Sequence, residues 1–234
     1  SAWHWLQDKP HCYYLVVMVV GKFSIVGRPI AEKPKREDGQ PIECYLYAPI
    51  GNEKSAQKAY AKTPAMVAHF SKIFEEPYPW DKYAQGLVRN FRAGGMENTS
   101  LTTMQAGSAR AAAGSQDDVI SHELAHQWFG DLMTCKGWEH AWLNEGWASF
   151  AEALWAETEQ SKSSRRSYQR LIAGFVGAQR GLNRTYAPLY APLVSNRYGD
   201  AMEPFMKPND IYSKGAVVLH MLRMKLGDEV FFRG

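Results

Sequence analysis

Short apolar runs separated by turn-forming residues fill the first fifty positions, and this is the pattern of β-strands. Val, Tyr, Ile and Phe dominate residues 3–49, with glycine and proline between the runs. The longest apolar run, residues 13–20, predicts a buried strand. The polar segment 32–40 predicts a solvated hairpin loop, and residues 42–47 return to a strand-like pattern. We therefore expect a β-rich segment up to residue 49.

Beyond residue 49 the apolar positions recur three and four residues apart, which is the spacing of helices. Residues 53–74 predict two short helices or one kinked helix, because Pro64 interrupts the pattern. A strand is expected at 87–91, before an irregular edge and a loop that extends to residue 116. Further helices are predicted at 118–129, 144–157, 161–180 and 211–226. A β-rich beginning and a mostly helical remainder indicate the α+β fold class.

The composition is that of an ordinary folded domain, with 45% apolar and 22% charged residues. The net charge is only +3, and Lys and Arg are spread among acidic residues, so we expect no nucleic-acid partner. Cys12, Cys44 and Cys135 form no close pair and are too few for a disulfide framework. No apolar run approaches the roughly 20 residues of a membrane-spanning helix, and no signal peptide is visible. We expect a soluble protein, from the cytoplasm or periplasm.

The strongest chemical signal is the sequence His122-Glu123-Leu124-Ala125-His126, an H-E-x-x-H motif on a predicted helix. Residues four apart lie one helical turn above each other, so His122 and His126 can direct ring nitrogens to one metal ion. Glu123 is rotated by about 100° from His122, so it can face the open side of the ion without binding it. This arrangement predicts a zinc site in which Glu123 takes a proton from water.

A catalytic zinc ion needs a third protein ligand and leaves its fourth position to water. The 18 residues from 127 to 144 separate the second histidine from Glu145, which begins the next predicted helix and is the expected third ligand. Glu152 lies seven residues further along the same helical face, where it either orients a ligand histidine or is a solvated or capping glutamate. The H-E-x-x-H motif alone is short enough to arise by chance, and Glu145 at this spacing favours the metal site.

Four motifs stand in this order along the chain: Gly94-Gly95-Met96-Glu97-Asn98, His122 to Gly130, Leu143-Asn144-Glu145-Gly146 and Tyr212-Ser213-Lys214-Gly215. With these motifs the sequence resembles the aminopeptidase N-like gluzincins, a family of zinc metallopeptidases that also includes the leukotriene hydrolases. The more common form of the first motif in this family has Ala in place of Gly95. The resemblance covers the chain from about Trp3 to its end, and it implies one Zn²⁺ ion held by His122, His126 and Glu145.

The resemblance also implies roles for residues that no local pattern marks. Glu97 is expected to bind the free α-amino group of a peptide, since a carboxylate makes a charge-assisted hydrogen bond to an ammonium group. Gly94, Gly95 and Met96 are expected to present backbone groups to the extended substrate. Tyr212 is expected to donate its hydroxyl to the oxyanion of the tetrahedral intermediate. These roles describe an aminopeptidase that acts on peptides with a free N-terminus.

Members of this family are longer than 234 residues and carry a β-rich domain before, and a helical domain after, a thermolysin-like catalytic domain. The resemblance assigns residues 1–49 to the end of the first domain and residues 50–234 to most of the catalytic domain. It therefore implies that parts of a longer protein are missing here. Two alternatives stay open at this point: an endopeptidase or epoxide hydrolase that uses the same metal site, and a zinc-bearing fragment without catalytic activity.

Overall fold

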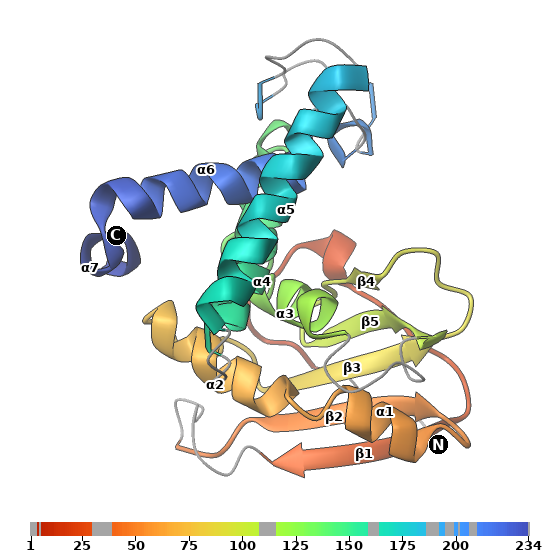
Figure 1. Cartoon of the computed structure of the whole chain (residues 1–234). Helices are drawn as coiled ribbons and strands as arrows, with labels where there is room; N and C mark the ends of the chain where they lie inside the picture. The colour runs from red at the N-terminus through yellow and green to blue at the C-terminus, as the bar shows by residue number, and fades with distance from the viewer. Residues whose placement is uncertain are drawn as a thin grey trace.

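A five-stranded sheet forms one side of the molecule, and a group of helices stands beside it (Figure 1). The structure, a computed structural model, describes residues 4, 6–29, 39–107, 116–158, 164–185, 192–194, 199–200, 202–205 and 210–233. The combination confirms the expected α+β fold class. Most of the hairpin loop expected at 32–40 lies outside the described residues.

The sheet has the strand order β1-β2-β3-β5-β4. Its inner pairs, β2 with β3 and β3 with β5, are parallel, whereas the outer pairs are antiparallel. Strand β2 ends at Pro49 and pairs with β3, so one sheet contains strands from both sides of this position. The division of the chain into two domains at residue 49 stays a prediction. The strands are β1 (Phe23–Pro29), β2 (Glu43–Pro49), β3 (Lys82–Val88), β4 (Gly95–Met96) and β5 (Leu101–Gln105).

Helices α1 (Glu53–Ala59), α2 (Thr63–Ile73) and α3 (Asp117–Ala125) lie over one face of the sheet (Figure 1). The prediction of two short helices at 53–74 is confirmed, and Pro64 stands in the first turn of the second. Alternate residues of β2 join apolar side chains of these three helices in one core. Its largest fully buried members include Trp80, Trp128, Tyr83 and Phe70. This core fixes α3 against the sheet.

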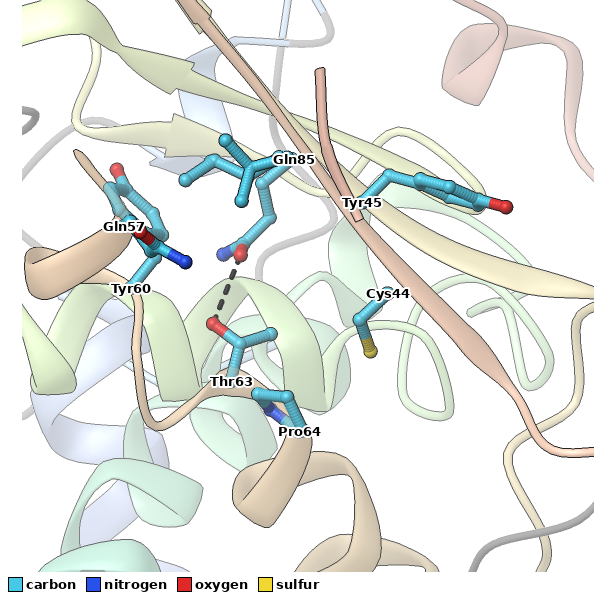
Figure 2. A pocket seen from close by; sticks show the side chains of 9 residues that line it. Cys44, Tyr45, Gln57, Tyr60, Thr63, Pro64 and Gln85 are labelled. Atoms are coloured by element: carbon cyan, nitrogen blue, oxygen red, sulfur yellow. Dashed lines mark hydrogen bonds between the residues drawn. The ribbon is translucent and has the colours of Figure 1, made fainter. Parts of the chain in front are cut away.

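A small pocket lies where the connection between α1 and α2 faces the sheet (Figure 2). Inside it, the hydroxyl group of Thr63 donates a hydrogen bond of 3.0 Å to Gln85 Oε1. Burial raises the pKa of the Cys44 thiol to about 12, so this cysteine is not a ready thiolate. None of the lining residues is charged, and none belongs to the four motifs: Val26, Cys44, Tyr45, Leu46, Gln57, Tyr60, Thr63, Pro64 and Gln85.

The helical part is arranged around α4 (Trp142–Thr158), which contributes to two cores. Ala151 and Trp155 on α4 belong to the core under the sheet, whereas Phe150 and Leu154 belong to a second, helical core. The second core also takes side chains from α5 (Ser164–Thr185), α6 (Ile211–Leu226) and α7 (Asp228–Arg233). Among the described residues, no helix combines the length and the apolar character needed to cross a bilayer.

Several predicted elements end or begin elsewhere than expected; the helices predicted at 144–157 and 161–180, for example, are α4 at 142–158 and α5 at 164–185. The strand predicted at 87–91 is β3, which begins five residues earlier at Lys82 and ends at Val88. The helix predicted at 118–129 ends at Ala125, because the chain turns after His126 and the Asp131 N–H donates to the His126 carbonyl at 3.0 Å. The helix predicted at 211–226 is confirmed with the same bounds.

The prediction of a buried strand at 13–20 is wrong. Tyr13–Leu15 forms one turn of 3-10 helix, and residues 16–20 belong to no strand. The side chains of Val16, Met18 and Val20 are 66%, 85% and 81% exposed. Apolar composition predicted burial throughout, but Leu15 alone of this stretch is fully buried, and no described strand pairs with residues 16–20. Two further 3-10 turns of the same length are Trp138–His140 and Glu203–Phe205.

Candidate active site

The three predicted metal ligands lie together where α3 meets α4. His122 stands in the last turn of α3, His126 caps that helix, and Glu145 lies in the first turn of α4. The two histidine Nε2 atoms are 3.2 Å apart, and each is 3.2 Å from Glu145 Oε2. These three atoms form a nearly equilateral triangle. Ligand atoms about 2.0–2.1 Å from a tetrahedral ion are separated by about 3.3–3.4 Å, so the triangle has the size of such a site.

The Nδ1 atoms of both histidine rings lie within hydrogen-bond distance of an oxygen acceptor. His122 Nδ1 lies 2.8 Å from Glu152 Oε1, and His126 Nδ1 lies 2.9 Å from the carbonyl oxygen of Phe129. Each Nδ1 must therefore carry the proton, and in a neutral ring the Nε2 atom then presents a lone pair. Two lone pairs and a carboxylate oxygen that converge at 3.2 Å repel one another unless a proton or a metal ion lies among them, and without a metal ion the neighbouring carboxylates favour a proton on His126. The residues thus fit a metal ion.

The charges of these buried groups depend strongly on each other. Burial alone lowers the pKa of His126, but the carboxylates of Glu97 and Glu145 outweigh it and raise this pKa to about 9. Burial raises the pKa of Glu145, but the two histidines outweigh it and lower this pKa to about 2. The carboxylate of Glu145 is therefore ionised at neutral pH, as a metal ligand must be.

Glu123 is buried beside this triangle, and burial raises its pKa to about 7 despite the opposing effect of the two histidines. Glu97, Glu123 and His126 form a second group whose ligand atoms lie within 4.8 Å of one another. Both groups need the same Nε2 atom of His126, because its Nδ1 bonds to Phe129. The arrangement therefore fits one ion, with Glu123 beside it. A Cβ atom on Gly95 would lie only 2.4 Å from the Glu123 carboxyl carbon, so glycine leaves room for this side chain.

The motif that contains Glu97 forms the edge of the sheet next to α3. Gly95 and Met96 make up the short strand β4, and Glu97 follows with only 8% of its surface exposed. Gln127, to which the sequence analysis assigned no role, joins this edge to the segment that follows α3. Its amide donates to the Glu97 carbonyl at 3.0 Å, and its oxygen accepts from the Ser100 N–H at 2.9 Å. No spacing rule marks such a residue, because its partners lie about thirty positions away.

Tyr212 is placed by the crossing of α4 and α6. Its ring is roughly parallel to that of His122, with centroids 6.1 Å apart. Burial, and next the charge of Glu145, raises the pKa of its hydroxyl, which stays protonated and able to donate. The crossing is close because Gly146 and Gly215 face each other: a Cβ on Gly215 would lie 2.7 Å from the Gly146 Cα. Each glycine is near a site residue, Glu145 or Tyr212.

All the predicted site residues thus meet in one region, and the geometry defines a class. Two histidines on one helix, a glutamate from the next helix and a buried glutamate beside them characterise metal-dependent peptidase domains. The chain belongs to peptidase family M1, since the Peptidase family M1 domain matches residues 58–234.

Relatives and solved structures agree with this assignment. The chain is 32% identical over 236 residues to aminopeptidase N of Homo sapiens, and this match covers 94% of the chain and 23% of the relative. It is 32% identical over 245 residues to aminopeptidase N of Streptomyces lividans, covering 100% of the chain and 27% of that protein. The crystal structure of an M1 zinc metallopeptidase from Deinococcus radiodurans superimposes with a TM-score of 0.65 at 29% identity, over 89% of this chain and 42% of that one. The chain thus spans about a quarter of the length of the curated relatives it matches.

Proposed function

We propose that this chain carries the catalytic centre of a zinc aminopeptidase, which releases N-terminal amino acids from peptides. The observation that carries the proposal is the triangle of His122 Nε2, His126 Nε2 and Glu145 Oε2, each pair 3.2 Å apart. One zinc ion is expected, because the neighbouring group shares His126. When bound, zinc supplies Lewis-acid polarisation of a carbonyl group and lowers the pKa of water.

The residues of the chain supply the remaining chemistry. Glu123 accepts a proton from the attacking water and returns it to the leaving amine, a role that suits a carboxyl group with a pKa of about 7. Glu97 accepts a hydrogen bond from the ammonium group of the substrate, while Gly94, Gly95 and Met96 present backbone groups to its chain. Tyr212 donates its hydroxyl proton in a hydrogen bond to the developing oxyanion.

The nature of solved relatives supports a peptide substrate. A mutant of the M1 zinc metallopeptidase from Deinococcus radiodurans was solved bound to a Tyr-Ser-Ala substrate, and a mutant of a two-domain M1 zinc metallopeptidase was solved bound to L-tryptophan. A tripeptide and a single amino acid are the substrate and product expected of an enzyme that removes one residue from an N-terminus. In this chain, a buried carboxylate at Glu97 gives the physical reason for preferring a free amine.

The test is hydrolysis of an aminoacyl anilide by the zinc-loaded chain, beside the same compound with an N-acetyl group. We expect turnover that a chelator abolishes and that N-acetylation lowers by at least about tenfold, since the blocked substrate leaves Glu97 without its charged partner. Equal cleavage of both compounds would indicate an endopeptidase instead. Stoichiometric zinc without any turnover would indicate a metal-bearing domain that needs the rest of a longer protein.

A further inference from the structure

Three segments that are distant in the sequence meet beside Glu97. Asn98 donates its side-chain amide to the carbonyl of Leu15 at 3.2 Å, which joins the N-terminal segment to the substrate edge. The Cys12 thiol lies 3.5 Å from the Thr134 hydroxyl, which joins the same segment to the turn after α3. Residues 12–15, 97–99 and 130–135 are therefore neighbours in the fold.

Each of these segments contributes a buried polar atom that makes no hydrogen bond of normal geometry to a described residue. These atoms are the Tyr14 hydroxyl, the Thr99 hydroxyl and both carboxylate oxygens of Asp131. Asp131 is only 2% exposed, and the Thr99 hydroxyl is near enough to its carboxylate to oppose the rise of its pKa on burial. Buried polar groups in native proteins are almost always satisfied by protein or by ordered water. An ordered water molecule can satisfy these atoms.

The cluster lies within electrostatic reach of the residue that we expect to bind the substrate amine. Burial raises the pKa of both Asp131 and Tyr14, and the charge of Glu97 is the second cause in each case. The carboxylate of Glu97 has no hydrogen bond to any other described residue. The backbone carbonyl of Glu97 accepts a hydrogen bond from Gln127, so only its side chain is without a hydrogen bond to a described residue. A group bound in the cluster is therefore placed to hold this side chain.

We propose that Asp131, Thr99 and Tyr14 bind an ordered water molecule, through which Asp131 acts as a positioning residue for Glu97. Hydroxyl groups and a carboxyl group offer both donors and acceptors, and a buried water needs two to four such partners. A metal cation is disfavoured, because the cluster offers only one carboxylate and two protonated hydroxyls. The positioning role rests on the proposed function, whereas the hydration site does not.

The hydration site is tested by a high-resolution crystal structure of the zinc-loaded protein and by thermal unfolding. We expect a water peak within 3.5 Å of Asp131 and at least one hydroxyl, with no anomalous scattering from a metal. The variant Asp131→Leu should lower the Tm by about 3–6 °C, since it strands the water and two hydroxyls. A matched control is Asp8→Leu at an exposed position. A dry cluster, a bound metal, or a raised Tm in Asp131→Leu would overturn the site.

The positioning role is tested by kinetics of Tyr14→Phe, which removes one hydroxyl and keeps the ring. We expect KM for the aminoacyl anilide to rise about three- to tenfold, with kcat within twofold and zinc content unchanged. Tyr13→Phe is the control, because Tyr13 is the neighbouring tyrosine and is 91% exposed. A merely structural defect would lower kcat and zinc content together. Asp131→Asn, which retains hydrogen bonds to water, should recover most of the affinity lost in Asp131→Leu.

The outcomes separate this inference from the proposed function. If the wild-type chain shows no aminopeptidase activity, the crystal structure and the melting experiment still decide whether the water is bound. If the water is present and KM does not change in Tyr14→Phe and Asp131→Leu, Asp131 does not position Glu97 and the second half of the proposal is wrong.

Discussion

The two halves of the candidate site differ in how completely the protein holds their side chains. The metal corner is formed by His122, His126 and Glu145. There the Nδ1 atom of each histidine is hydrogen-bonded to a neighbour, which is Glu152 for His122 and the Phe129 carbonyl for His126. At the substrate edge, the Glu97 carboxylate has no hydrogen bond to a described residue, and the hydroxyl of Thr99, two positions further along the chain, makes none of normal geometry to a described residue. At the metal corner the protein itself fixes both ligand histidines, whereas at the substrate edge the remaining hydrogen bonds come from the molecules that bind there.

This difference has a structural cause. The metal corner is built by two packed helices, where spacing along one helix and a short connection fix the ligand atoms. The substrate edge is a two-residue strand followed by a turn in which Ser100 adopts a positive φ of 62°. Such edges satisfy their backbone groups with difficulty, and long-range partners such as Gln127 must stabilise them. The two packed helices therefore fix the ligand atoms precisely, whereas the short strand and its turn let the substrate edge adapt to the peptide.

The largest expected effect comes from removing a ligand of the metal corner. Glu145→Ala leaves two histidines and no anionic ligand, so zinc affinity should fall by more than about a hundredfold, because even residues behind the ligands contribute about 10- to 100-fold. Zinc content after dialysis measures this loss, and Glu229→Ala, at an exposed helix position, is the control. Full zinc retention in Glu145→Ala would remove this residue from the ligand set.

The next effect separates metal binding from catalysis. Glu123→Gln keeps the size of the side chain but cannot accept a proton, so kcat should fall by about 10²- to 10⁴-fold while zinc content stays at the wild-type level. Single-turnover hydrolysis of the anilide, with metal analysis of the same sample, checks both parts. Turnover near the wild-type value would assign the proton transfer to another group.

A smaller effect is expected at the substrate edge. Glu97→Gln removes the negative charge that faces the substrate ammonium, so KM for a free-amine substrate should rise about 10- to 100-fold, in line with a hydrogen bond to a charged group. The comparison predicts that zinc content is unaffected, because Glu97 is not among the three ligands. A variant that loses zinc as well as affinity would mean that the two halves of the site are not independent.

The same difference explains how much the sequence could predict. His122, His126 and Glu123 lie within five residues on one helix, so their geometry follows from helical periodicity alone. Glu97 and Tyr212 reach the site from a sheet edge and a distant helix, and only the family resemblance suggested them. Gln127 and Asp131 were missed because tertiary packing supplies their surroundings. The run at 13–20 was predicted to be a buried strand because apolar composition does not reveal which segments pair, and several of its side chains are in fact exposed.

The contact between α4 and α6 offers the last test, because it affects both halves at once. Gly215→Ala places a methyl group 2.7 Å from the Gly146 Cα, where backbone cannot yield without moving a helix. Overpacking of this kind costs about 1–3 kcal/mol in unfolding free energy, measured by urea denaturation. Gly174→Ala on α5 is a matched control, since its Cβ meets nothing within 4 Å and a helical Gly→Ala change should stabilise by about 0.5–1 kcal/mol. If Gly215→Ala retains zinc but its kcat falls, the position of Tyr212 depends more strongly on this crossing than the position of Glu145 does. Loss of zinc alone would mean that the position of Glu145 depends on it more strongly.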